Sequence, residues 1–296
     1  MQFKSPLPIR DGVAASYLWL PEGRWNNMLE FLLAQFPDVQ ESTWRLRMEK
    51  NELLDAQGNT LQANSVAKRG MCIFYYRELQ AETAIPFEAR IIHQDKHLLV
   101  VDKPHFLPVT PGGRFLHETL LVRLKKTLKL EHLTPIHRLD RETAGVILFS
   151  CEPTSRGIYQ RLFQQRAIQK TYHALAPHLP NLHFPLIYRS HMLESEQFFV
   201  MQEGIGNTNS ETEIDIIERR GELSLYRLHP STGKKHQLRV HLASLGAPIV
   251  NDSFYPIALP CKGDDFSRPL KLLAKSISFT DPINAEIRHF ESQQSL

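Results

Sequence analysis

The chain has 296 residues, of which 42% are hydrophobic and 23% charged, a balance that is ordinary for a soluble globular protein and leaves ample material for a core. This length allows one large domain or one domain with an appendage. The net charge of +3 permits a polyanionic partner but does not require one, because a local patch of charge matters more than the total.

The cysteines argue against a metal site and against a disulfide framework. Cys72, Cys151 and Cys261 are odd in number and far apart, without a CxxC pair or a His/Cys cluster. Scattered thiols fit a reducing compartment. The N-terminus has no basic region leading into an apolar core, and no apolar run approaches the roughly 18 residues of a membrane span. We therefore expect a cytoplasmic protein without a signal peptide or membrane segment.

The first 87 residues predict a small α/β extension. Between Trp25 and Phe36 the apolar residues recur at the spacing of one helix face, and Pro37 ends this helix. The other elements expected here are a helix over 42–54, a turn over 55–59 and a strand over 71–76. A boundary near Phe87 divides the chain into residues 1–87 and 88–296.

The next fifty residues predict a hairpin, a loop and a basic helix. Two apolar runs within residues 91–101 flank the polar turn at 94–97. Prolines and glycines between 107 and 113 predict a loop. Residues 120–130 predict a helix with Arg123 and three lysines on its outer face. Contact with phosphate and simple solvation explain this basic face equally well.

A dense group of charges at residues 137–145 precedes a wholly apolar run at 146–149, which predicts a loop entering a buried strand. Asp140 is then held near buried surface between Arg138 and Arg141. Burial raises the pKa of a carboxylate and a nearby guanidinium lowers it. An ionised Asp in this position could serve as nucleophile, base or charge stabiliser. Alternatively, the loop carries an ordinary surface ion pair.

Residues 155–166 predict a helix and residues 168–176 a strand. Side chains along a strand repeat every second residue, so Ile168, Lys170 and Tyr172 share one face. Taken alone, Tyr172 is simply a good strand former. The acidic stretch 193–222 predicts a peripheral sheet that would face away from a polyanion, because like charges repel.

A second charged block spans residues 228–252. Leucines at helical spacing and Gly246 as C-cap predict a helix that begins near His236. On this helix His236 and Arg239 lie on one face, being three residues apart. A basic helix end of no special role would have the same sequence. Residues 268–282 predict a closing strand.

Several of these segments resemble motifs of the RluA-type (ribosomal large subunit) RNA pseudouridine synthases. The signature His-Arg-Leu-Asp-x-x-Thr-Ser-Gly matches residues 137–145, with Ala144 in place of Ser. The family's Lys-Pro pair matches Lys103-Pro104, and its Lys-x-Tyr motif matches Lys170-Thr171-Tyr172. The motif Thr-Gly-Arg-x-His-Gln-Ile-Arg-x-His-Leu matches residues 232–242, with Lys234 in place of the first Arg. The family also commonly has His where Leu273 stands and His where Thr110 stands.

The resemblance implies an α+β pseudouridine synthase fold, with a mixed, mainly antiparallel sheet, a central cleft and flanking helices. It assigns the essential carboxylate to Asp140, its ion-pair partner to Arg239, and the ring that packs against uracil to Tyr172. Arg138 would fill the space that a flipped base leaves, and Leu272 would form an apolar wall. The further residues expected to contact substrate or RNA are His137, Arg141, Thr143, Lys170, Lys234, His236 and Gln237.

The activity implied is isomerisation of uridine to pseudouridine in ribosomal or transfer RNA, which needs no cofactor or metal. We expect RNA as the partner, no membrane, and a monomer. Two alternatives stay open. One is an RNA-binding protein of this fold that has lost activity, which the changes at Ala144, Lys234 and Leu273 would allow. The other is a nucleoside hydrolase-like enzyme acting on small molecules.

Residues 1–87 distantly resemble the alpha-L RNA-binding module that precedes many RluA-type catalytic domains. A degenerate copy of that module and an unrelated extension fit equally well. The residues that would face RNA in such a module are Arg45, Arg47, Lys50, Lys68 and Arg69. A solvated basic surface is the alternative explanation for them.

Overall fold

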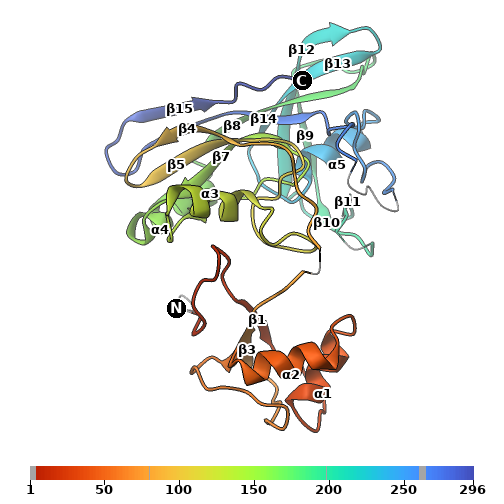
Figure 1. Ribbon diagram of the computed structural model, residues 1–296. Helices are drawn as coiled ribbons and strands as arrows, with labels where there is room; N and C mark the ends of the chain where they lie inside the picture. Colours follow the sequence, from red (N-terminus) through yellow and green to blue (C-terminus); the bar gives the residue numbers. More distant parts are fainter. Residues whose placement is uncertain (1–4, 80, 198, 260–264) are drawn as a thin grey trace. The chain divides into compact units, whose positions relative to one another are not determined.

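The computed structural model describes residues 5–79, 81–197, 199–259 and 265–296 (Figure 1). Cys261, one of the three scattered thiols, lies outside the described residues. The chain forms two compact units, one of Met1–Glu82 with Pro111–His117 and one of Thr83–Thr110 with Glu118–Leu296. Within the described ranges, no helix has the length and apolar character needed to cross a bilayer.

The first unit packs two helices on a three-stranded antiparallel sheet. Its elements are β1 (Ser16–Trp19), α1 (Met28–Gln35), α2 (Glu41–Glu49), β2 (Leu53–Asp55) and β3 (Cys72–Tyr75), with the strands in the order β1-β3-β2. The side chain of Asn27 caps α1 by accepting from the Glu30 amide at 2.9 Å. The second helix was predicted over 42–54 but ends at Glu49. Asn51 adopts a left-handed conformation with φ 55°, and Leu53 and Leu54 pair with β3 instead.

The second unit contains a ten-stranded sheet. Eight strands follow one path in the order β4 (Arg90–Gln94), β5 (Leu98–Lys103), β7 (Ala144–Ser150), β14 (Leu272–Thr280), β8 (Gln169–Pro177), β13 (Leu223–Pro230), β12 (Ser210–Arg220) and β9 (Leu186–Ser190). Off this path, β15 (Ile287–Glu291) pairs with β14 and β6 (Thr134–Pro135) with β7. Strands β10 (Met192–Glu194) and β11 (Met201–Glu203) form a separate hairpin. Of the pairs among the described strands, β7 with β14 is parallel and the others are antiparallel, which confirms the predicted mixed, mainly antiparallel sheet.

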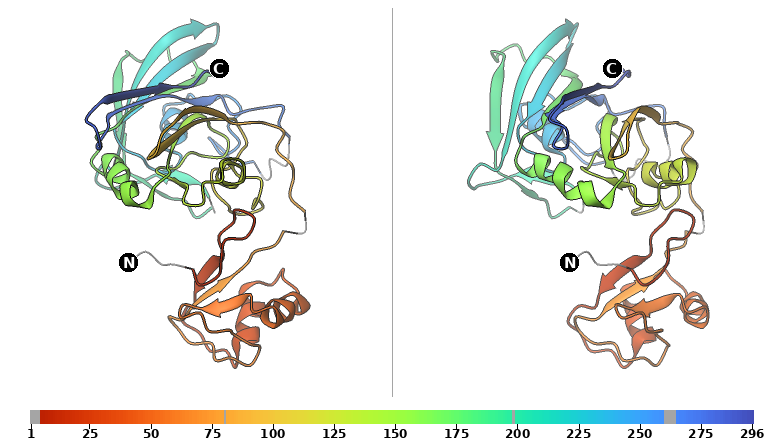
Figure 2. Two further views of the ribbon diagram at one scale, coloured as in Figure 1. Left: turned by 60° about the vertical axis from the view of Figure 1, so that its left-hand side comes forward. Right: turned by 90° about the vertical axis from the view of Figure 1, so that its left-hand side faces the viewer.

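The helices of the second unit are α3 (Leu120–Leu128), α4 (Pro153–Gln164) and α5 (Gln237–Ser244). Of these, α4 and α5 cover the same face of the ten-stranded sheet, whose strong twist is visible in Figure 2. Tyr172, Ala174 and Ala176 of β8 pack in one apolar cluster with α5, whereas Ile168, just before β8, packs in another with α4. Alternate residues share a face, so α4 and α5 lie on one side of the sheet with a gap between them.

Gly145 allows β7 and β14 to come close together at this gap. Its φ is +108°, a conformation that favours glycine, and a Cβ atom on it would lie 2.2 Å from the carbonyl oxygen of Ala274. The close approach aligns Ala144 with Leu273 in the parallel pair. The loop before β7 is thereby placed beside the start of β14, and Asp140 and Leu272 line the same pocket.

Candidate active site

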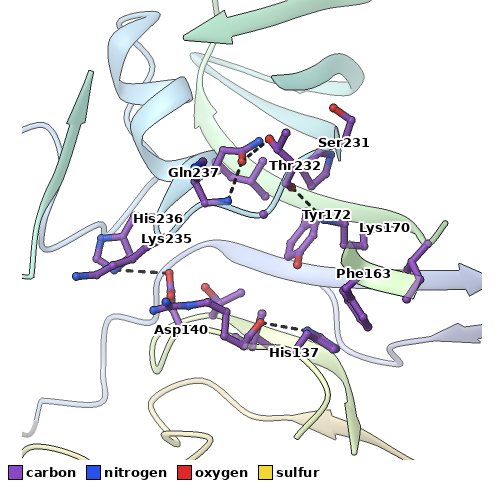
Figure 3. Close-up of a pocket in the computed structure, with 18 of the residues that line it drawn as sticks. His137, Asp140, Phe163, Lys170, Tyr172, Ser231, Thr232, Lys235, His236 and Gln237 are labelled. Carbon is purple, nitrogen blue, oxygen red and sulfur yellow. Dashed lines mark hydrogen bonds and ion pairs between the residues drawn. The ribbon is translucent and has the colours of Figure 1, made fainter. Parts of the chain in front are cut away.

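The gap between α4 and α5 is a pocket of about 920 Å³. Strands β8 and β14 form its floor, and the loops 136–143 and 230–236 form much of its wall (Figure 3). Eleven of the twelve residues predicted from the motifs line it. They are His137, Arg138, Asp140, Thr143, Lys170, Tyr172, Lys234, His236, Gln237, Arg239 and Leu272.

Asp140 stands on a tight turn, closed by a hydrogen bond from the Thr143 amide to the Asp140 carbonyl at 3.2 Å. Its side chain is 17% exposed, and its Oδ2 atom lies 3.6 Å from Nη1 of Arg239 and 3.8 Å from Nε2 of His236. In Figure 3 the carboxylate is directed at His236. Among the described residues, no group donates a hydrogen bond of ordinary length to either carboxylate oxygen. Asp140 is therefore surrounded by positive and polar groups yet free to accept a hydrogen bond from a substrate.

The tight partner of Arg239 is Asp252 rather than Asp140. The Nε and Nη2 atoms of Arg239 donate to the two oxygens of Asp252 at 2.8 and 2.6 Å, and both side chains are buried. Burial opposes the charge of Arg239, but the hydrogen bonds to Asp252 outweigh it and raise the pKa of the guanidinium above its ordinary value. A buried arginine requires such a partner. The acid is 13 residues along the chain, beyond the end of α5, and the motif alone did not indicate it.

One guanidinium nitrogen of Arg239 takes no part in the pair with Asp252. Its Nη1 atom is buried and has no hydrogen-bond partner within the described part of the chain. This is the nitrogen that faces Asp140. A buried charged donor without a partner costs free energy, and such groups concentrate at functional sites.

Tyr172 enters the pocket from β8. Burial, together with the charge of Asp140, raises the pKa of its phenol above the ordinary value. The phenol is therefore neutral near pH 7 and offers an apolar ring with a hydroxyl at its tip. Leu272 of the neighbouring strand is 3% exposed and forms the apolar wall beside it.

Lys170 and Gln237 hold the loop 230–236 in place. The Lys170 ammonium donates to the Thr232 carbonyl at 3.1 Å, and burial together with Arg166 lowers the pKa of this lysine to about 8. The Gln237 oxygen accepts from Thr232 and Lys234 at 2.7 and 3.1 Å. Its amide nitrogen donates to the Glu211 carbonyl and the Thr212 hydroxyl, both at 2.9 Å. Because both the oxygen and the nitrogen of its side chain are hydrogen-bonded to other residues of the protein, Gln237 stabilises the shape of the pocket wall.

His137 is a neutral histidine that is hydrogen-bonded to the backbone of strand β7. Its Nε2 atom accepts from the Leu148 amide at 3.1 Å, so the ring hydrogen is on Nδ1 and is donated to the Arg138 carbonyl at 3.1 Å. The ring stacks on Phe163, with 4.6 Å between centroids. Burial lowers the pKa of His137 to about 4, which is consistent with this bonding.

Arg141 is the predicted residue that does not line the pocket. Its Nε atom donates to the Phe106 carbonyl at 3.0 Å, and its guanidinium lies 3.4 Å from Glu142. Behind it, the fully buried Lys103 donates to the carbonyls of Pro104, Leu107 and Arg141 at 2.9–3.0 Å. Burial lowers the pKa of Lys103 to about 7. These bonds brace the backbone next to Asp140.

A match to the protein-family model described as RNA pseudouridylate synthase covers residues 97–244, half of the chain. The chain is 31% identical over 212 residues to the dual-specificity RNA pseudouridine synthase RluA of Haemophilus influenzae, which covers 69% of this chain and 92% of that protein. It is 27% identical over 233 residues to the uncharacterized RNA pseudouridine synthase slr1592 of Synechocystis sp., covering 77% of this chain and 79% of that one.

A solved structure of human RNA pseudouridylate synthase domain containing 4 is similar in fold and sequence. It superposes with a TM-score of 0.55 at 29% identity, covering 69% of this chain and 88% of the human one. These findings confirm the family and fold class predicted from the motifs. The chain therefore belongs to the RNA pseudouridine synthase family, whose enzymes are isomerases that act on uridine in RNA.

Proposed function

We propose that this enzyme makes pseudouridine in ribosomal or transfer RNA with Asp140 as its essential carboxylate. The observation that carries the proposal is the placement of Asp140. Its carboxylate is 17% exposed in the pocket and is faced by Arg239 and His236. Among the relatives, the name of a yeast mitochondrial protein, 28% identical over 241 residues, specifies a transfer-RNA substrate.

The reaction breaks the bond between ribose C1′ and uracil N1 and forms one between C1′ and C5. The proton on C5 is lost and N1 gains one, so the reaction is an isomerisation without redox change. Asp140 would act on the ribose, as nucleophile or as base. The ring of Tyr172 would hold the detached uracil while it turns, since an aromatic face stacks on any base.

The pocket walls suit a nucleotide that is part of an RNA chain. At about 920 Å³ the pocket is at the upper end of the range for small-molecule sites. Besides Arg239 and Lys170, which are bonded to Asp252 and to the Thr232 carbonyl, the arginines and lysines that line it are Arg138, Arg166, Lys234 and Lys235. These cations would contact phosphates on either side of the target, and Arg138 would take the place of the base that leaves its stack.

The proposal is tested with Asp140→Asn, which keeps the shape of the side chain and removes its charge. The readout is tritium release from RNA labelled at uridine C5, beside RNA binding at several salt concentrations. Turnover should fall below detection while folding and salt-sensitive RNA binding persist, because the phosphate contacts are untouched. The control is Asp38→Asn, the same change at an exposed aspartate of the other unit.

Wild-type-like turnover by Asp140→Asn would refute the assignment. A wild-type chain that binds RNA but releases no tritium would instead be a binding module. One that liberates uracil from free uridine would be a hydrolase.

We further propose that the enzyme is cytoplasmic, monomeric and independent of metal ions. The scattered thiols support the compartment, and the completeness of the pocket within one chain supports the monomer. Cell fractionation, sedimentation and turnover in excess chelator test these three points.

A further inference from the structure

The two side chains that face Asp140 are those of Arg239 and His236. Both form hydrogen bonds with one short segment, residues 252–255. Asp252 binds Arg239 through two hydrogen bonds, and its Oδ1 atom also accepts from the Phe254 amide at 2.8 Å. The Tyr255 hydroxyl lies 2.8 Å from Nδ1 of His236. The segment follows α5 in the chain and contributes no side chain to the pocket lining.

The hydrogen on the His236 ring can be located by counting donors and acceptors. The Tyr255 hydroxyl accepts a hydrogen bond from the Met201 amide at 2.9 Å. Among the described residues, its only other partner is Nδ1 of His236. The hydroxyl must therefore donate to Nδ1, because otherwise a buried O–H group would be left unpaired at a cost of about 1–3 kcal/mol. Burial raises the pKa of Tyr255 to about 12, so the hydroxyl keeps its hydrogen.

With Nδ1 as an acceptor, the ring hydrogen of a neutral His236 is on Nε2. Burial lowers the pKa of His236 to about 4, which keeps the ring neutral near pH 7. Nε2 is the atom that lies 3.8 Å from Oδ2 of Asp140. The N–H group of His236 thus faces the same carboxylate oxygen as Nη1 of Arg239.

The backbone and ring contacts show that His236 is held in this orientation. It adopts a left-handed conformation with φ 55°, which is uncommon for a residue other than glycine and occurs mainly where surrounding structure enforces it. Its ring stacks on Phe254 at 5.5 Å between centroids, with 20° between planes. The side chain is 5% exposed.

We propose that His236 and Tyr255 are positioning residues for the essential carboxylate. Tyr255 holds His236 in the tautomer with hydrogen on Nε2. That hydrogen, with Nη1 of Arg239, orients Oδ2 of Asp140 and leaves Oδ1 to act on the ribose. This inference rests on the proposed role of Asp140. It assigns His236 to the carboxylate rather than to direct contact with RNA.

The tautomer is measured directly by nitrogen-15 NMR of the full chain with labelled histidine, because the ring nitrogens shift differently with and without hydrogen. The His236 signals are identified by their loss in His236→Gln. We expect hydrogen on Nε2 in the wild type and loss of this preference in Tyr255→Phe. Hydrogen on Nδ1 in the wild type would overturn the proposal.

Kinetics supply the second test. Tyr255→Phe and His236→Ala should lower kcat by about tenfold or more, as loss of an oriented donor does, with KM for RNA within about twofold of wild type. His236→Gln, whose amide keeps an N–H group, should retain more activity than His236→Ala. The control is Tyr226→Phe, which removes a hydroxyl that donates to the Pro177 carbonyl away from the pocket.

Equal losses in His236→Gln and His236→Ala, or an unchanged kcat in His236→Ala, would contradict the proposal. Asp140→Asn measured in parallel distinguishes the positioning role of His236 from the proposed function. If that variant is inactive while His236→Ala is fully active, the positioning role fails and the proposed function stands. If Asp140→Asn turns over normally, the proposed function itself fails.

Discussion

At the scale of single residues, Arg239 serves two carboxylates in different ways. A guanidinium presents parallel N–H groups that match one carboxylate in a fork. Asp252, whose side chain is fully buried, occupies that fork. The remaining nitrogen faces Asp140, which is partly exposed and farther away. One acid therefore fixes the arginine, and the other receives its spare donor beside the substrate.

Removal of the inner acid should be costly. In Asp252→Ala a buried guanidinium loses both of its short hydrogen bonds, so the free energy of unfolding should fall by about 3–5 kcal/mol. Turnover should fall as well, because Arg239 is no longer directed at Asp140. Denaturant unfolding and tritium release measure the two effects.

Glu218→Ala is the matched control, since it breaks a largely exposed pair with Arg220 in the same unit. We expect this variant to lie within about 0.5 kcal/mol of wild type. Equal unfolding free energies for the two variants would show that the Arg239–Asp252 pair adds nothing.

At the scale of elements, the joint between β7 and β14 places the essential carboxylate. The two strands run parallel here, and their backbones approach at Gly145 more closely than any side chain would allow. The loop that carries Asp140 ends at this joint. Separation of the strands would therefore move Asp140 relative to Tyr172 and Leu272 on the neighbouring strands.

Gly145→Ala tests this joint. The added methyl would collide with the Ala274 backbone at 2.2 Å and would be strained at φ +108°, so we expect a loss of at least about 2 kcal/mol in unfolding free energy, together with lower kcat. Gly157→Ala provides the contrast. On helix α4 the new methyl meets only the far end of Arg161 at 3.9 Å, and alanine should stabilise the helix by about 0.5–1 kcal/mol. Similar effects of the two changes would contradict the close approach.

At the scale of the whole molecule, buried histidines couple stability to pH. Burial lowers the pKa of His137, His236 and His241 to about 4, against an ordinary value of 6.5. His241 is fully buried and bonded to the hydroxyls of Ser210 and Thr212 at 3.0 and 2.9 Å. Burial of this ring disfavours its charged form.

We therefore expect the second unit to lose stability on acidification between pH 6.5 and 4. In this range the unfolded chain binds protons that the folded chain excludes, so stability is complete above pH 6.5 and declines toward pH 4. His241 alone should contribute roughly 3 kcal/mol to this decline. Denaturant unfolding across the range measures it.

His241→Gln should show a shallower decline, whereas His289→Gln, at an exposed histidine, should follow the wild type. A decline that is identical in all three proteins would exclude His241 as a source.

The sequence by itself determined most elements and the set of residues that meet in the pocket. Helices such as α4 and hairpins such as β4–β5 can be predicted from the spacing of apolar residues. This spacing is a local property of the sequence, because it involves only residues close together in the chain. The family followed from motifs about 100 residues apart, each of which places charged side chains at fixed intervals. Eleven of the twelve predicted residues line one pocket for this reason.

The tertiary structure alone decided which partners those residues take. Arg47, which would face RNA if residues 1–87 formed an alpha-L module, is buried, and its guanidinium lies 3.7 Å from the carboxylate of Glu78. Arg123, predicted on the outer face of its helix, donates instead to the carbonyls of Ile85 and Phe87. Long cationic side chains reach partners distant in the chain, and local periodicity carries no information about those partners.

The same reason explains Asp252 and Tyr255. Their side chains become partners of Arg239 and His236 only after the chain turns back at the end of α5. Spacing along the chain identifies a charged residue, but burial and the need to pair every buried donor decide what it binds.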